Sequence, residues 1–174
     1  LLSMICGNIL DTKVYDSIIK TSRERHVDVI MATPPCQGIS TAGQQIEGDE
    51  RNSLTIPALH SIQDLEPKYA VLENVPGYLK TTIDYNGQLC LIPDIISDTL
   101  GDKYEISFNV IDTADYGVPQ VRERAIVLLS RKDQPVWELP SKSNRIVTMR
   151  DAIGNLPMID PFIKDLDTTE FQRM

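Results

Sequence analysis

A cysteine stands directly after an apolar run of the sequence, in the segment Thr-Pro-Pro-Cys-Gln-Gly at 33–38. Two prolines fix the backbone before Cys36 and a glycine frees it afterwards, so the segment is predicted to present the thiol at the end of a strand. A thiolate in an exposed, electropositive setting is a nucleophile. A buried structural cysteine explains this segment equally well when it is considered alone.

An acidic side chain follows another apolar run, in the segment Glu-Asn-Val-Pro-Gly at 73–77. If Glu73 faces a pocket at the end of its strand, its carboxyl group can give a proton or a hydrogen bond to a ring nitrogen of a substrate. An ordinary solvated carboxylate on a loop is the alternative.

A third segment places polar and cationic side chains on every second position, namely Gln120, Arg122 and Arg124. In a strand this spacing sends all three to one face. Two guanidinium groups on one face suit phosphate or carbonyl oxygens. A salt-bridged edge strand explains the same pattern.

Apolar runs and helical periods alternate along the chain and predict the elements that must position these segments. Strands are expected at 1–5, 27–32, 69–72, 106–111 and 125–129. Helices are expected after the cap Asp11, over 54–65, over 92–100 with Pro93 in the first turn, and briefly at 149–153. This order predicts an α/β fold with a mostly parallel sheet and helices on both faces. Catalytic residues of such sheets collect on loops at the carboxyl ends of the strands.

Composition narrows the classes of function. The cysteines Cys6, Cys36 and Cys90 include no Cys-x-x-Cys pair and the two histidines are far apart, so neither a disulfide framework nor a metal site is expected. No apolar run is long enough for a membrane span and no secretory signal opens the sequence, which predicts a cytoplasmic protein. The net charge of -8 opposes DNA binding unless another segment supplies a basic surface.

Taken together, the three segments closely resemble three signature motifs of the DNA cytosine-5 methyltransferases, in the family's order, and the resemblance covers about 6–132. It implies an incomplete Rossmann-like fold, S-adenosylmethionine as methyl donor and double-stranded DNA as substrate. A cytosine is flipped out of the duplex. Cys36 adds to its carbon 6 and Glu73 engages ring nitrogen 3. Arg124 contacts the base, and Arg122 lies near a phosphate.

The resemblance also implies binding roles for other residues. The cofactor is expected at Asn8, Ile9, Pro34 and Leu54, with Asn8 standing where the family usually has Asp. Substrate or DNA contacts are expected from Gln37, Ser40, Gln120 and Asn74, and Asn74 is also expected to brace the Glu73 turn. The polar segment 40–50 resembles the family's mobile loop that closes over DNA.

Two parts of the family pattern are not found in the sequence: the glycine-rich first cofactor motif and the target-recognition domain. We therefore expect a partial catalytic domain over 1–133, a connector over 134–174, and a chain that is inactive by itself. The expected absence of a strand beside 27–32 leaves an open sheet edge, which predicts self-association and displacement of 1–5. A bacterial source, action at the nucleoid and a cognate restriction endonuclease as partner fit this family.

Two alternatives stay open. An RNA cytosine-5 methyltransferase shares the Pro-Pro-Cys-Gln and Glu-Asn-Val logic, and a comparison of methyl transfer to duplex DNA and to tRNA discriminates the two. A non-catalytic module that keeps the fold for binding is the other alternative.

Overall fold

The computed structural model describes residues 4–35 and 54–156. In chain order the elements are α1 (Thr12–Glu24), β1 (Val29–Ala32), α2 (Thr55–Leu65), β2 (Tyr69–Asn74), η2 (Pro76–Lys80), β3 (Thr82–Tyr85), β4 (Gln88–Leu91), α3 (Ile92–Leu100), β5 (Tyr104–Asp112), η3 (Thr113–Tyr116), β6 (Glu123–Arg131) and α4 (Met149–Ile153). The predictions for Cys36, Gln37, Ser40 and the 40–50 segment lie outside the described residues.

The four helices predicted from apolar period and capping are confirmed. Asp11 caps α1, since its side chain accepts a hydrogen bond from the backbone N–H of Lys13 at 2.9 Å. Pro93 lies in the first turn of α3, where its missing N–H costs no helical hydrogen bond. Thr148 and Asp151 form a reciprocal capping box at the start of α4.

Four strands form one sheet in the order β1-β2-β6-β5. β1 and β2 pair in parallel, whereas β6 runs antiparallel to both β2 and β5. Three of these strands therefore share one direction, as predicted, but β6 lies reversed between two of them. The reversal follows from the short connection 113–122 between β5 and β6, because a parallel neighbour needs a longer crossover.

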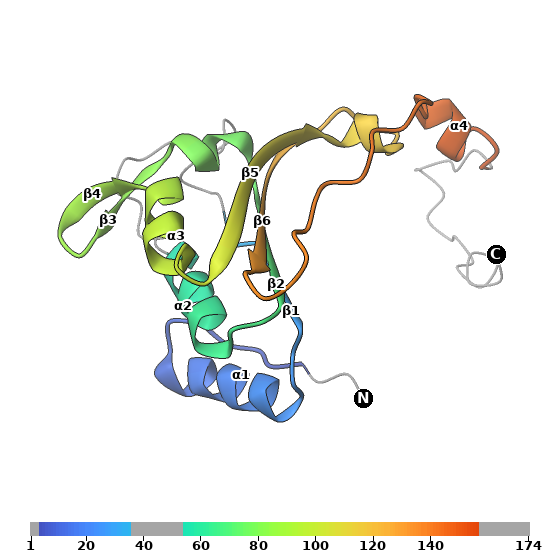
Figure 1. The fold of residues 1–174 in the computed structure, drawn as a ribbon. Helices are drawn as coiled ribbons and strands as arrows, with labels where there is room; N and C mark the ends of the chain where they lie inside the picture. Colours follow the sequence, from blue (N-terminus) through green and yellow to red (C-terminus); the bar gives the residue numbers. More distant parts are fainter. Residues whose placement is uncertain (1–3, 36–53, 157–174) are drawn as a thin grey trace, which may run out of the picture.

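Helices were predicted on both faces of the sheet, and among the described residues they lie on one. α2 and α3 pack against the sheet face that contains Ala70, Leu72 and Val127, and α1 packs beside α2 (Figure 1). The connections through α2 and α3 step across the sheet in the same direction. Crossover connections of the same handedness that move across a sheet in the same direction place their helices on the same face of that sheet.

The core lies between this face and the helices. Its most buried side chains include Ile62 and Leu59 of α2, Ile95 and Ile96 of α3, and Leu129 of β6. Alternate strand residues point to the two faces, so Val71 and Leu128 are buried on the opposite side. Burial on both faces makes β2 and β6 the rigid centre of the molecule.

The opposite face is crossed by the segment after β6, the orange trace in Figure 1. Trp137 packs on Tyr69 in a tilted arrangement, with ring centroids 4.8 Å apart and an interplanar angle of 46°, and its backbone N–H donates to Ser130 Oγ at 2.7 Å. Tyr69 in turn donates from its hydroxyl to Pro135 O at 3.2 Å. This segment is thus packed on the sheet, and the boundary predicted at 133 stays a prediction.

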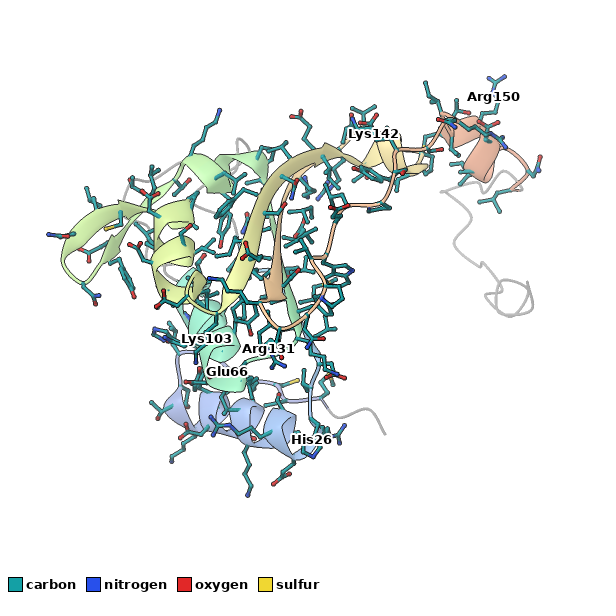
Figure 2. The ribbon with its side chains drawn as sticks, in the orientation of Figure 1. His26, Glu66, Lys103, Arg131, Lys142 and Arg150 are labelled. Carbon is teal, nitrogen blue, oxygen red and sulfur yellow. The ribbon has the colours of Figure 1, made fainter. Side chains whose placement is uncertain are left out.

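A charged cluster ties the connections at one end of the sheet. Glu66 after α2, Lys103 after α3 and Arg131 at the end of β6 converge there (Figure 2). Arg131 Nη1 donates to Glu66 O at 2.5 Å, its Nε–Asp133 Oδ1 distance is 2.7 Å, and Lys103 pairs with the Glu66 carboxylate. The hydrogen bond that Arg131 donates to the Asp133 carboxylate raises the pKa of Arg131 and lowers the pKa of Asp133.

The strand predicted at 1–5 is wrong for the residues that are described. Met4 and Ile5 lie outside any strand and are 87% and 38% exposed. Apolar composition alone cannot make a strand, because a strand needs a hydrogen-bonded neighbour. No helix in the described parts of the chain combines the length and apolar character that crossing a membrane requires.

Candidate active site

Three segments that are distant in the sequence meet at one edge of the sheet. β1 and β2 are parallel and Ala32 pairs with Leu72, so the residues after Ala32 and the last residues of β2, Glu73 and Asn74, lie at the same edge. β6 is antiparallel to β2, with Asn74 opposite Ala125, so β6 begins where β2 ends. The topology therefore brings the start of β6 to the loops that follow β1 and β2.

A cavity of about 230 Å³ lies at this edge. It is lined by Thr33, Pro34, Pro35, Glu73, Asn74, Val75, Arg122 and Arg124. The predicted side chains Glu73, Arg122 and Arg124 thus surround one space, and the residue before Cys36 forms part of its wall. Their catalytic roles stay predictions.

An ion pair joins two of these side chains. Arg124 Nε lies 2.8 Å from Glu73 Oε1, and the side chains are 17% and 34% exposed. Arg124 Nη1 also donates to the backbone oxygen of Glu123 at 2.6 Å. Because the guanidinium is held on two sides, it fixes the orientation of the carboxylate toward the cavity.

Asn74 connects the loop before Cys36 to the turn after Glu73. Its side chain is buried, with Nδ2 donating to Pro34 O at 3.0 Å and Oδ1 accepting from Val75 N at 2.9 Å. Both ends of the amide are therefore engaged by backbone. This geometry fits the predicted bracing role and gives no support to the predicted substrate contact.

Gln120 does not share a strand face with the arginines. β6 begins at Glu123, so the argument from strand alternation is wrong for the residues before it. Gln120 is exposed, and its backbone oxygen accepts a hydrogen bond from Thr113 Oγ1 at 2.7 Å. Arg122 also precedes the strand, and the turn, not the strand pleat, brings it to the cavity.

A second, larger cavity of about 480 Å³ runs along β1. Three residues predicted to hold the cofactor, Ile9, Pro34 and Leu54, line it. The fourth, Asn8, is not in the lining, and its Oδ1 accepts from Leu10 N at 3.1 Å. The other lining residues are mostly apolar: Ile18, Ser22, Val29, Ile30, Met31, Ala32, Thr33, Pro35, Ala58, Ser61 and Leu65.

The volume and the apolar wall of this second cavity suit the flat, weakly polar ring of an adenine-containing cofactor. Thr33, Pro34 and Pro35 line both cavities. The two spaces therefore meet at the loop that leads into Cys36, which is the relation that a group transfer between two bound molecules requires. Thr33 was not predicted as a site residue, although its position between the end of a strand and Pro34 is a signal that could have indicated it.

Within the described ranges, no group of three or more His, Cys, Asp or Glu side chains could hold a metal ion. Tyr78 lies buried below the Glu73 turn, and burial raises its pKa to about 12. It therefore stays neutral over the pH range in which proteins work.

A sheet with a reversed strand beside its edge strand, one cavity at the carboxyl ends of its parallel strands and an adjoining cavity along β1 define a methyltransferase-like domain. The chain belongs to the C-5 cytosine-specific DNA methylase family, whose model matches residues 3–172. Members of this family take their methyl group from S-adenosylmethionine.

Related proteins agree with this assignment. The chain is 40% identical over 162 residues to the Type II methyltransferase M1.HgaI of Avibacterium volantium, covering 90% of this chain and 45% of that protein. It is 34% identical over 141 residues to M.XorII of Xanthomonas oryzae, covering 80% of this chain and 32% of that protein. The chain thus spans less than half the length of these relatives.

Solved structures share the fold. One described as a prophage-encoded DNA modification methyltransferase of E. coli matches with a TM-score of 0.65 and 24% identity, over 88% of this chain and 42% of that one. The Entamoeba histolytica methyltransferase EhMeth matches with a TM-score of 0.53 and 18% identity, over 81% of this chain and 47% of that one. At these identities the likeness concerns the fold alone.

Proposed function

We propose that this chain provides the catalytic centre for methylation of carbon 5 of cytosine in double-stranded DNA. The supporting observation is the cavity in which the Glu73–Arg124 ion pair faces the loop leading into Cys36. A thiol, a carboxyl group and a guanidinium at one small cavity suit a planar, hydrogen-bonding base. A base inside a duplex is hidden by stacking, so the target cytosine must be flipped out to reach such a space.

Nucleophilic addition is the step that the proposed cysteine performs. Carbon 5 of cytosine is a poor nucleophile while the ring is conjugated. The Cys36 thiolate forms a bond to carbon 6, and the electron pair of the 5,6 double bond moves toward carbon 5 as Glu73 protonates or hydrogen-bonds ring nitrogen 3. S-adenosylmethionine supplies the methyl group. Removal of the proton from carbon 5 by a base restores the double bond and expels Cys36 as thiolate.

The two arginines have different proposed roles. Arg124 holds the Glu73 carboxylate and contacts the cytosine. This role suits Arg124 because it is less exposed than Arg122 and is already paired with Glu73. Arg122 is exposed at the rim of the cavity, where a guanidinium can meet a DNA phosphate. Because the chain has a net charge of -8, its attraction to DNA phosphate depends more on locally placed cations such as Arg122 than on the overall electrostatic field of the chain.

The cofactor is proposed to bind along β1. Ile9, Pro34 and Leu54 would hold its adenosyl part against the apolar wall of the larger cavity. We further propose that the 174-residue chain alone binds S-adenosylmethionine weakly and does not methylate DNA, because the family's glycine-rich cofactor motif is not in its sequence. Calorimetric titration tests this proposal, and micromolar affinity would contradict it.

Covalent trapping tests the function itself. A protein in which the chain is joined to the regions that its relatives carry would be incubated with cofactor and a DNA duplex containing 5-fluorocytosine, whose fluorine blocks the final elimination. We expect a stable protein–DNA adduct that Cys36→Ser abolishes. Absence of the adduct together with retained DNA binding would instead support a non-catalytic module.

The polynucleotide class is tested with the same protein. Methyl transfer to duplex DNA and to tRNA is compared under equal conditions. Transfer confined to tRNA would replace the DNA proposal with its RNA alternative.

A cognate restriction endonuclease is proposed as a partner in the host, since the named relatives are Type II methyltransferases. DNA methylated by the active protein should then resist that endonuclease.

A further inference from the structure

The turn 113–122 between β5 and β6 is fastened at its base by one carboxylate. Asp112 is the last residue of β5, and its Oδ1 accepts hydrogen bonds from Ala114 N and from Arg122 N, each at 3.0 Å. The first of these donors begins the turn and the second ends it. A single oxygen atom therefore binds the backbone near both ends of the connection.

The neighbouring threonine adds to this closure. Thr113 N donates to Arg122 O at 3.1 Å, and Thr113 Oγ1 donates to Gln120 O at 2.7 Å. The bonds farther out, such as Gly117 N to Ala114 O at 3.2 Å, fold the turn without reaching Arg122. The backbone of Arg122 is thus held through its N–H by Asp112 and through its carbonyl by Thr113.

This anchoring matters because Arg122 lies before the first residue of β6. The strand ladder pairs Asp112 with Glu123 and Ile111 with Arg124, so it fixes Arg124 but not Arg122. Arg122 still lines the cavity beside Glu73. Its side chain is long and exposed, so its direction depends on the backbone from which it starts.

We propose that Asp112 is a positioning residue of the site: by closing the 113–122 turn it sets the place from which Arg122 enters the cavity and meets DNA. The catalytic consequence rests on the proposed function. Both donors are neutral backbone N–H groups, so an acceptor oxygen is needed and a negative charge is not. Asparagine at this position keeps an acceptor oxygen and alanine does not.

The hydrogen-bonding part is tested on the chain as it stands by amide exchange. Asp112→Ala should speed exchange at both Ala114 and Arg122 about tenfold, while Asp112→Asn stays close to the wild type. Asp11→Ala is the matched control, because Asp11 makes the same kind of carboxylate-to-backbone bond, to Lys13, at the remote helix α1. Unchanged exchange at Arg122 in Asp112→Ala would overturn the proposal.

The functional part is tested on the protein that carries the additional regions of its relatives. DNA affinity is measured against salt for Asp112→Ala, Arg122→Ala and the double variant. Each single variant should lower the salt slope by about one, as for a lost phosphate contact. The double variant should match Arg122→Ala alone, because both changes remove one interaction. Asp112→Asn should restore the wild-type slope.

Outcomes of this second test separate the two proposals. Additive effects of Asp112→Ala and Arg122→Ala would overturn the positioning role even if the protein methylates DNA. A wild-type protein that binds no DNA and methylates none would refute the proposed function instead. In that case the exchange measurements still decide whether Asp112 holds Arg122. Asp11→Ala should leave both slope and methyl transfer unchanged.

Discussion

At the scale of single residues, the Glu73–Arg124 ion pair combines two demands. In the proposed function, Arg124 holds the Glu73 carboxylate, and that carboxylate must still reach a substrate in the cavity. A planar guanidinium meets both demands, because it can bind one oxygen through Nε and direct its remaining N–H groups elsewhere. The bond from Nη1 to Glu123 O shows this division of donors.

Arg124→Lys is therefore expected to damage the site although it keeps the charge. An ammonium group cannot hold the Glu73 carboxylate and the Glu123 carbonyl in the same fixed geometry. We expect methyl transfer by the complete protein to fall about 100-fold, as misplacement of a reacting group generally causes. Arg23→Lys on α1, where Arg23 donates to Asp64 O at 3.0 Å, is the control and should be silent. Equal activity of both variants would contradict the role of the ion pair.

Two buried tyrosines provide a test of local stability. Tyr104 donates from its hydroxyl to Pro67 O at 2.7 Å, whereas the Tyr78 hydroxyl has no hydrogen-bond partner within the part of the chain that the structure describes. They are 2% and 1% exposed. Tyr104→Phe should lower the free energy of unfolding by about 1 kcal/mol, and Tyr78→Phe should leave it unchanged or raise it. Denaturant titration of both variants checks the contrast, and equal losses would refute it.

At the scale of elements, the sequence pattern predicted the helices and strands whose signals come from residues close together in the chain. α1 is marked by the cap Asp11 and an apolar period, and α4 was placed at its observed bounds from a short period alone. The first part of β2, residues 69–72, is an apolar run, as expected of a strand that is covered on both faces. The strand was predicted to end at Leu72, but β2 continues to Asn74, because Glu73 and Asn74 pair with Ile126 and Ala125 of β6.

Features that depend on pairing between distant segments, such as strand direction and the bounds of a strand, were not predictable in the same way. The direction of β6 is set by the length of the turn after Asp112 and by its place between β2 and β5. The misassigned face of Gln120 has the same origin, since a strand start is fixed by its partner strand and not by local alternation. The hydrogen bonds of Asn74 and Asp112 likewise join segments far apart in the chain or across a turn.

The segment after β6 contacts the rest of the molecule through Tyr69 of the sheet and through Asp115 of η3, and the two contacts differ in physical character. Trp137 packs on Tyr69, an apolar contact, while Lys142 pairs with Asp115 at 2.6 Å on the surface. Asp115 also raises the pKa of Lys142 through this hydrogen bond. The backbone N–H of Ser143 adds a bond to Asp115 O at 2.6 Å.

Substitutions at these two points should differ in their effect. Trp137→Ala removes a half-buried ring and is expected to lower the free energy of unfolding by about 2 kcal/mol. Lys142→Ala removes an exposed ion pair and should change it by less than about 0.5 kcal/mol. Thermal or denaturant unfolding of the two variants measures the difference. A larger loss for Lys142→Ala would show that charge, not stacking, holds the segment.

At the scale of the whole molecule, β1 and β5 are the two edge strands of the sheet in the described residues, and β1 is the one beside the proposed site. It pairs with β2 alone, and Val29 and Met31 are 45% and 72% exposed on it. Backbone N–H and C=O groups along such an edge are available to another strand, and apolar side chains favour the contact. The neighbouring cavity along β1 widens the apolar surface.

The chain by itself is therefore expected to self-associate through β1. Met31→Lys places a charge on this edge and should shift the chain toward monomer in sedimentation experiments, because strand pairing would bury the ammonium group. Leu89→Lys is the matched control: Leu89 is 70% exposed, but it lies in the separate β3–β4 hairpin. If the wild-type chain is monomeric at every concentration, or if both variants dissociate it equally, β1 is not the contact.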